Sequence, residues 1–315
     1  MQISSTSGAA TVRAANRRGI AAMSLAMAGF VANDSLVKLV SETLPSAQLI
    51  FIRGLFATML LLVVAQAMGS LRPQQPGAPA GGVRVMLQRP VLVRALLDAL
   101  ATLTYLTSLF HLPIGNATAI NMATPLFITL FAVLAFHERV GPARWLAVAA
   151  GFAGVLLVVQ PSAAGFNAYA LLCLVGTLFH AGRDLMTRTI HHSVPSVLIT
   201  LATAVAVTLL SGVLSAVQGW QPVGARQLGQ LAAASVFLSV GYYLIIVGMR
   251  SGEMSVIAPF RYTGLLFALA IGWAIWGDVP NALAWAGIAL LVGAGLYVLH
   301  SERERARAGL EAAAD

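Results

Sequence analysis

Residues 19–46 read GIAAMSLAMAGFVANDSLVKLVSETLPS, and the interpretation of the whole chain starts from this stretch. It is a long apolar run that carries Asp34, then Lys38 four positions later, and then Pro45. An acid and a base four residues apart lie one above the other on a helix and can pair. Because charged groups inside an apolar helix are costly in lipid, their presence here needs an explanation.

The same landmarks occur again in residues 169–196, which read YALLCLVGTLFHAGRDLMTRTIHHSVPS. Asp184, Arg188 and Pro195 each lie 150 positions after their counterpart in the first stretch. Two apolar helices can resemble each other through composition alone. The shared order and the constant offset instead favour a duplicated unit of about 150 residues that fills the chain twice.

The composition indicates a membrane protein. Of 315 residues, 58% are hydrophobic and only 10% are charged, too few to cover a water-soluble domain of this size. The net charge of +8 comes from basic residues spread over short loops, so it does not indicate nucleic-acid binding. The single cysteine, Cys173, leaves no internal disulfide and no cysteine cluster for zinc. We expect a lipid bilayer as partner and neither a metal nor a cofactor.

Ten apolar spans can be read along the chain. They lie at about 19–40, 46–68, 91–110, 115–136, 145–160, 168–187, 196–217, 228–249, 254–276 and 282–300. These spans are too long and too uniformly apolar for barrel strands, which predicts an all-α membrane protein with ten transmembrane helices. The first span follows a basic segment as a signal peptide does, but its apolar run continues to Val40, so we expect an uncleaved helix.

The placement of arginines predicts the topology. With the amino terminus in the cytoplasm, thirteen arginines of the tails and loops lie on the cytoplasmic side and only Arg226 lies opposite. We therefore expect a multi-pass protein of the bacterial inner membrane with both termini cytoplasmic. Five spans per half is an odd number, so the second half is inverted relative to the first, as in many secondary transporters. The predicted units are a tail at 1–18, repeats at 19–160 and 166–300, and a tail at 301–315.

The ends of the two halves also match, because Glu138 precedes Trp145 by the same seven positions that separate Asp278 from Trp285. With this feature the sequence resembles the EamA branch of the drug/metabolite transporter superfamily. The resemblance covers about residues 19–300. It rests on the two five-span halves and on Asp34, Lys38, Pro45, Ala119, Pro125, His137, Glu138, Trp145, Val256, Ala258, Pro259, Trp276, Asp278, Gly287 and Gly293. Within that branch the sequence is most similar to bacterial aromatic amino-acid exporters, which implies export of amino acids.

The fourth and ninth spans are candidates for moving parts. They begin with segments rich in small residues, 115–125 and 252–262, which contain Pro125 and Pro259. Small residues let helices approach closely, and a proline removes one backbone hydrogen bond, which bends a helix. We predict that both prolines act in gating, although a static kink would give the same pattern.

A substrate cavity is expected near the midplane, between the halves. It would take an amino-acid zwitterion with an apolar side chain. Asn121, His180 or Arg261 could hold the charged end. Arg261 could instead pair with Asp98 or Asp184, and His180 could be an ordinary buried histidine. The apolar wall is predicted from Met122, Tyr242, Tyr243, Phe260 and Tyr262.

Three charge pairs are predicted as scaffold rather than as transport groups: Asp34 with Lys38, Arg94 with Asp98, and Asp184 with Arg188. Arg53 is interpreted in the same way. Arg183 is an intramembrane arginine like Arg261, and Tyr105 could line the cavity or lie at the membrane interface.

These features predict a monomeric secondary transporter that exports amino acids by alternating access. Another small metabolite, such as a nucleoside, a flavin or a sugar, is the alternative substrate, and a channel is a further alternative. The sequence contains no phosphate-binding loop for ATP and no hydrolase motif, so we do not expect an enzyme.

Overall fold

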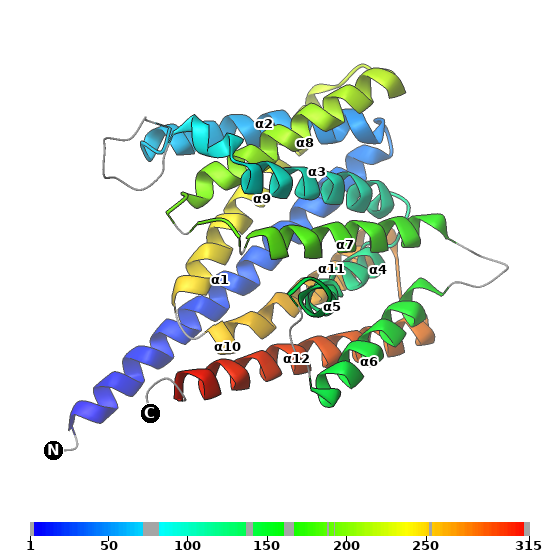
Figure 1. Ribbon diagram of the computed structural model, residues 1–315. Coiled ribbons are helices and arrows are strands. Elements are labelled where there is room, and N and C mark those ends of the chain that lie inside the picture. The colour runs from blue at the N-terminus through cyan, green and yellow to red at the C-terminus, as the bar shows by residue number, and fades with distance from the viewer. Residues whose placement is uncertain are drawn as a thin grey trace.

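The computed structural model describes residues 3–71, 82–136, 141–160, 167–187, 189–191, 193–251 and 254–311. Every regular element in these ranges is a helix, as the sequence predicts (Figure 1). The first half holds α1 (Ile3–Ser41), α2 (Ser46–Ala67), η1 (Val83–Leu87), α3 (Arg89–Leu109), α4 (Ile114–Asn121), α5 (Thr124–Phe136) and α6 (Pro142–Val159). The second holds α7 (Ala168–Thr187), α8 (Ser196–Gln218), α9 (Ala225–Ser251), α10 (Met254–Ile257), η2 (Ala258–Tyr262), α11 (Thr263–Trp276) and α12 (Ala282–Glu311).

Eight helical stretches in the described residues are long and apolar enough to cross a membrane. They correspond to eight of the ten predicted spans. The other two predicted spans are α6, whose apolar part is the shorter Trp145–Val159, and α7. The second half of α7 is more polar than the other spans because it carries His180, Arg183 and Asp184. All three residues line an internal cavity. The fold is thus a helical membrane protein.

The two ends of the chain are more helical than the sequence predicts. The helix α1 begins at Ile3, within the predicted tail 1–18, and α12 continues to Glu311, beyond the predicted last span. The start of α1 and the end of α12 lie at the same end of the molecule (Figure 1).

Both proline-containing spans are interrupted. The fourth span breaks between α4 and α5, at Met122 and Ala123, just before Pro125. The ninth passes through α10 and the 3-10 helix η2, which contains Pro259, before α11 begins. A proline lacks the N–H that a continuing helix needs, which accounts for both breaks.

Helices from the two halves pack against each other. The pairs are α1 with α9, α3 with α7, α2 with α8, and α6 with α12. Glycines allow the closest of these approaches. A Cβ atom on Gly154 of α6 would lie 2.7 Å from the carbonyl oxygen of Gly287 in α12. A Cβ atom on Gly287 would in turn lie 2.6 Å from the carbonyl oxygen of Gly154, so both positions exclude a side chain.

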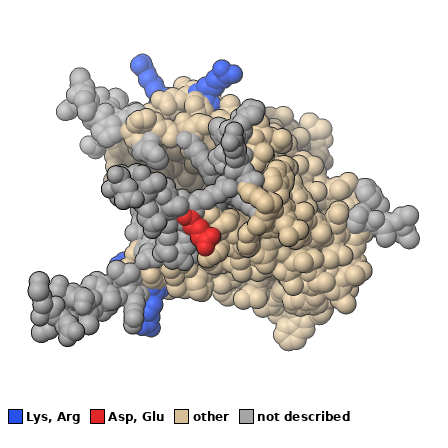
Figure 2. All heavy atoms as spheres, turned by 60° about the horizontal axis from the view of Figure 1, so that its bottom comes forward, with Lys and Arg blue, Asp and Glu red and all other residues tan. Residues whose placement is uncertain are grey.

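The main apolar core lies toward the end of the bundle at which α1 passes into α2. Its buried residues there include Val40, Leu49, Leu109 and Ile114. The exterior is apolar as well: Val63 is 66% exposed and Leu146 is 73% exposed, as lipid-facing side chains are. In the view of Figure 2, Lys, Arg, Asp and Glu are few, and the right-hand part of the described surface consists of other residues. The core therefore closes one end of the bundle, while the exterior suits a bilayer.

Candidate functional site

A cavity of about 390 Å3 opens inside the bundle, between the two halves. Residues of α1, α2, α3, α4, α5, α7, α8, α9 and α11 line it, together with η2 and the Leu299 side chain of α12. Seven predicted site residues line this cavity: Asn121, Met122, Pro125, His180, Tyr242, Arg261 and Tyr262. The cavity therefore brings together residues that lie far apart in the sequence.

Three other predicted residues do not line the cavity. Tyr243 is 66% exposed on the exterior, because neighbouring residues on a helix point in different directions. Phe260 packs against the buried cluster of Met23, Met27 and Ile257 instead. Pro259 marks the break in the ninth span but is not part of the cavity wall.

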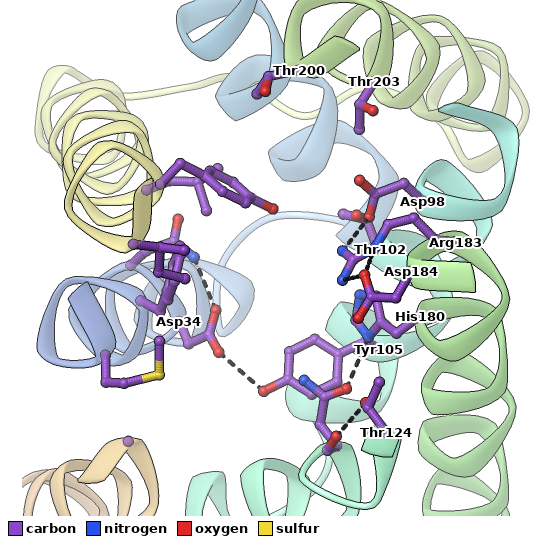
Figure 3. A pocket seen from close by; sticks show the side chains of 18 of the residues that line it. Asp34, Asp98, Thr102, Tyr105, Thr124, His180, Arg183, Asp184, Thr200 and Thr203 are labelled. Carbon is purple, nitrogen blue, oxygen red and sulfur yellow. Dashed lines mark hydrogen bonds and ion pairs between the residues drawn. The ribbon is translucent and has the colours of Figure 1, made fainter. Parts of the chain in front are cut away.

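Asp34, predicted from the sequence to belong to the scaffold, faces the cavity from α1 (Figure 3). The hydroxyl of Tyr105 donates to Oδ2 of Asp34 at 3.0 Å. The amide Nδ2 of Asn33 donates to Oδ1 at 2.9 Å, and Arg53 donates to Oδ1 of Asn33 at 3.2 Å. Arg53, Asn33, Asp34 and Tyr105 thus form a chain of hydrogen bonds that joins α2, α1 and α3.

Lys38 and Asp34 bind different partners, and the described residues contain no ion pair between them, so the predicted Asp34–Lys38 pair does not form. The ammonium of Lys38 donates to the carbonyl oxygens of Leu109, at 2.9 Å, and of Leu112. It also lies 5.4 Å from the centre of the Trp276 ring. Leu109 is the last residue of α3 and Leu112 follows it, so no helical N–H remains to bind these carbonyls, which is why they attract the lysine.

A balanced network of charges forms the opposite wall of the cavity (Figure 3). Arg183 binds Asp98 at 2.8 Å and Asp184 at 2.7 Å. Arg94 lies 3.7 Å from Asp98, which confirms the predicted contact between these two residues, and also donates to Thr203 at 2.8 Å. The predicted partner of Asp184, Arg188, lies outside the described residues.

The third polar group consists of His180 and Asn121. Nδ1 of His180 lies 2.8 Å from Oδ1 of Asn121, within hydrogen-bond distance. The break between α4 and α5 follows directly after Asn121, and the hydroxyl of Thr124 donates to the Asn121 carbonyl at 2.6 Å. The His180 ring also lies 6.0 Å from the ring of Tyr105. This group links α7 to the interrupted span.

Two cations on the cavity wall retain free hydrogen-bonding capacity. Nε of Arg53 is buried and has no hydrogen-bond partner among the described residues. Arg261 lines the cavity and forms no ion pair with Asp98 or Asp184, the partners considered from the sequence. The buried Nε of Arg53 points to a ligand or to water in the cavity, and the exposed Arg261 is accessible to a ligand that enters it.

Sequence reasoning missed Asn33, assigned Asp34 and Arg53 to structural roles, and left the roles of Arg183 and Tyr105 open, although all five line the cavity. One signal was available for the charged residues. A charge deep in an apolar span normally faces a cavity or the interior of a bundle. Asn33 gave no comparable signal, because single polar residues occur on every face of such helices.

The sequence model of the EamA-like transporter family matches the chain twice, at residues 17–160 and 167–299. Similar proteins include the pseudopaline exporter CntI of Pseudomonas aeruginosa, 28% identical over 297 residues, which are 91% of this chain and 98% of that protein. A riboflavin transporter of Rhizobium johnstonii is 32% identical over 217 residues, 69% of this chain and 72% of that protein. An S-adenosylmethionine uptake transporter of Rickettsia bellii is 23% identical over 290 residues, 91% of this chain and 94% of that protein.

The fold has also been seen before. A solved crystal structure matches with a TM-score of 0.58 and 19% sequence identity, covering 91% of this chain and 97% of that one. At this identity the match concerns the fold alone.

A helical bundle with an apolar exterior and an internal cavity lined by both charged and apolar side chains is typical of a multi-pass membrane protein that handles small molecules. The chain belongs to the EamA-like transporter family, since the match covers most of its length. The relatives are named as transporters of small molecules, which favours transport over catalysis. They support the family but not the narrower likeness to aromatic amino-acid exporters.

Proposed function

We propose that the protein is a secondary transporter that exports small metabolites of the amino-acid type by alternating access. One observation carries this proposal: a cavity lined by charged and aromatic side chains lies inside an otherwise apolar bundle, with walls from both halves. Such a cavity suits a small molecule with a charged end and an apolar body. Its volume of about 390 Å3 falls within the range of small-molecule sites.

The residues that line the cavity can bind both the charged end and the apolar side chain of an amino acid. Arg261 offers a guanidinium for the carboxylate, which it can bind through two hydrogen bonds. Tyr242, in edge contact with Phe30 at 5.2 Å between ring centres, offers an aromatic surface for the side chain. S-adenosylmethionine, named for one relative, also contains an amino-acid group. Aromatic and other apolar amino acids are therefore the first substrates to test.

Riboflavin is the second candidate substrate. A relative with 32% identity over 69% of this chain is named as a riboflavin transporter. The aromatic surface of Phe30 and Tyr242 suits a flat ring system as well as an amino-acid side chain.

Alternating access would follow from two inverted repeats, at residues 19–160 and 166–300. The two family matches support this division. So do the ring contacts. Phe30 and His180, which lie 150 positions apart, each contact a tyrosine of the facing helix, Tyr242 in α9 and Tyr105 in α3. The breaks at Pro125 and Pro259 occupy the fourth span of each half and would serve as the bending points.

The proposed topology places both termini in the cytoplasm of a bacterium, with the protein in the inner membrane as a monomer. The common position of the start of α1 and the end of α12 supports this arrangement (Figure 1). The cavity lining reaches Leu299, near the end of the apolar part of α12 (Ala282–Ser301), whereas Lys38 and the main core close the other end. In this topology the cavity is open to the cytoplasm, as needed to load an exported substrate.

Uptake by the purified protein in liposomes tests the proposal. The panel contains phenylalanine, tryptophan and methionine, with S-adenosylmethionine, riboflavin, a nucleoside and a sugar beside them. We expect saturable counterflow of the amino acids. Tyr242→Ala should weaken it, while Tyr243→Ala is the matched control, because that neighbouring tyrosine lies outside the cavity. Uptake of riboflavin without any amino acid would select the second candidate, and unsaturable flux would indicate a channel.

A further inference from the structure

Asp34 and Asp184 occupy equivalent positions 150 residues apart, yet their surroundings differ in charge. In each half the preceding residue binds the carboxylate. Asn33 donates to Asp34 at 2.9 Å, and Arg183 donates through Nε to Asp184 at 2.8 Å. The geometry is therefore shared, but a neutral amide in the first half stands where a cation stands in the second.

The difference leaves Asp34 without a direct counter-ion. Asp184 and Asp98 share Arg183, and Asp98 also faces Arg94, so two acids meet two bases on that wall. Within the described residues, Asp34 accepts hydrogen bonds only from the neutral groups of Asn33 and Tyr105 and forms no ion pair. Arg53 binds the far side of Asn33 rather than the carboxylate.

The position of Asp34 makes its charge available to a ligand. Its carboxylate faces the cavity, across from the network of Asp98, Arg183 and Asp184 (Figure 3). Two donors hold its oxygens in place, and a carboxylate has lone pairs for further donors. The rings of Tyr105, Tyr242 and Phe30 also line the cavity, and aromatic faces attract cations. Arg53 acts on this carboxylate only across Asn33, so the Asp34 oxygens lack a cation in direct contact.

We infer that Asp34 binds the ammonium group of the substrate and thereby selects amino acids over their deaminated analogues. The inference rests on the proposed function, in which Arg261 holds the carboxylate of the same molecule. Asn33 and Tyr105 are positioning residues, because their hydrogen bonds fix the Asp34 oxygens. Because position 33 holds a neutral asparagine where the equivalent position 183 holds an arginine, only the first half provides a subsite for a cation.

Three probes built on one scaffold test the inference: phenylalanine, phenethylamine, which lacks the carboxylate, and 3-phenylpropionate, which lacks the ammonium. Each competes with labelled phenylalanine for counterflow into liposomes. We expect the wild-type protein to bind phenylalanine best and phenethylamine far better than phenylpropionate. In Asp34→Asn, the affinity for phenylalanine and phenethylamine should fall by about 10- to 100-fold, since a charge-assisted hydrogen bond is lost. The affinity for phenylpropionate should stay the same or rise.

Asp34→Glu is the matched control, because it keeps the charge and should retain the preference for the ammonium. If Asp34→Asn does not fold, the probe series on the wild-type protein still decides. Phenylpropionate competing as well as phenylalanine would overturn the inference and leave the proposed function standing. Unchanged affinities in a folded Asp34→Asn variant would also overturn the inference alone. A variant that loses only pH-driven uptake and keeps counterflow would overturn it too, because Asp34 would then be a proton carrier. Transport of riboflavin alone would overturn both proposals.

Discussion

Gly295 leaves the space that the Tyr262 side chain fills, and this contact can be tested with a single methyl group. A Cβ atom at Gly295 would overlap the hydroxyl of Tyr262 and lie 2.6 Å from its Cζ atom. We expect Gly295→Ala to lower the free energy of unfolding by about 1–3 kcal/mol, the usual cost of overpacking. Thermal unfolding in detergent measures this change. Gly293→Ala in the same helix is the control, because its added Cβ meets no atom within 4 Å. Equal melting of both variants would contradict the contact.

The contacts and orientations of single side chains were predicted correctly in some cases and wrongly in others. Helical spacing correctly paired Arg94 with Asp98, but the same rule paired Asp34 with Lys38, whose ammonium instead binds the free carbonyls after α3. The spacing of residues within one helix cannot predict that a side chain will bind a hydrogen-bond acceptor on another helix. Likewise it could not tell Tyr242, which lines the cavity, from its neighbour Tyr243, because the direction of a side chain depends on how the helix is rotated.

At the scale of elements, Lys38 ties α1 to the end of α3 and to the Trp276 ring of α11. Replacing it with methionine keeps much of the volume but leaves the Leu109 and Leu112 carbonyls without this donor. We expect the Lys38→Met variant to be less stable by about 1–3 kcal/mol, the cost of buried groups without a partner. Scanning fluorimetry in detergent measures the unfolding midpoint. Lys38→Arg keeps a donor and should melt closer to the parent. A Lys38→Met protein as stable as the parent would rule out this capping role.

The break between α4 and α5 gives a second prediction about elements. Pro125→Ala restores a backbone N–H at the second position of α5 and favours one continuous helix. If bending here alternates access, the variant should transport several-fold more slowly, with no loss in thermal stability. Pro90→Ala is the control, because Pro90 occupies the first turn of α3, where proline suits a helix, and its replacement should leave the rate unchanged. A Pro125→Ala variant that transports at the parental rate would exclude gating at this break.

At the scale of the whole molecule, composition and repeated landmarks carried most of the prediction. They indicated a helical membrane protein and the EamA family, and both are confirmed. They also identified seven residues of the cavity wall, because polar groups in apolar spans and the small-residue segments are visible in a sequence. The charge network across α3 and α7 was not predictable. It depends on Arg183 reaching Asp98, 85 positions away, and only the packing of the two helices decides that contact.

Topology is the remaining whole-molecule prediction, and exposed turns at the two ends of the bundle test it. Thr43 and Pro222 are exposed near the end that Lys38 closes, whereas Gln88 and His191 are exposed at the other end. Single cysteines at these four positions, in a Cys173→Ser background, report which side each faces. With both termini cytoplasmic, an impermeant maleimide should label Thr43→Cys and Pro222→Cys in intact spheroplasts. Gln88→Cys and His191→Cys should react only after lysis, which also serves as the control for reactivity. The opposite pattern would reverse the topology, and the cavity would then face the outside and favour uptake over export.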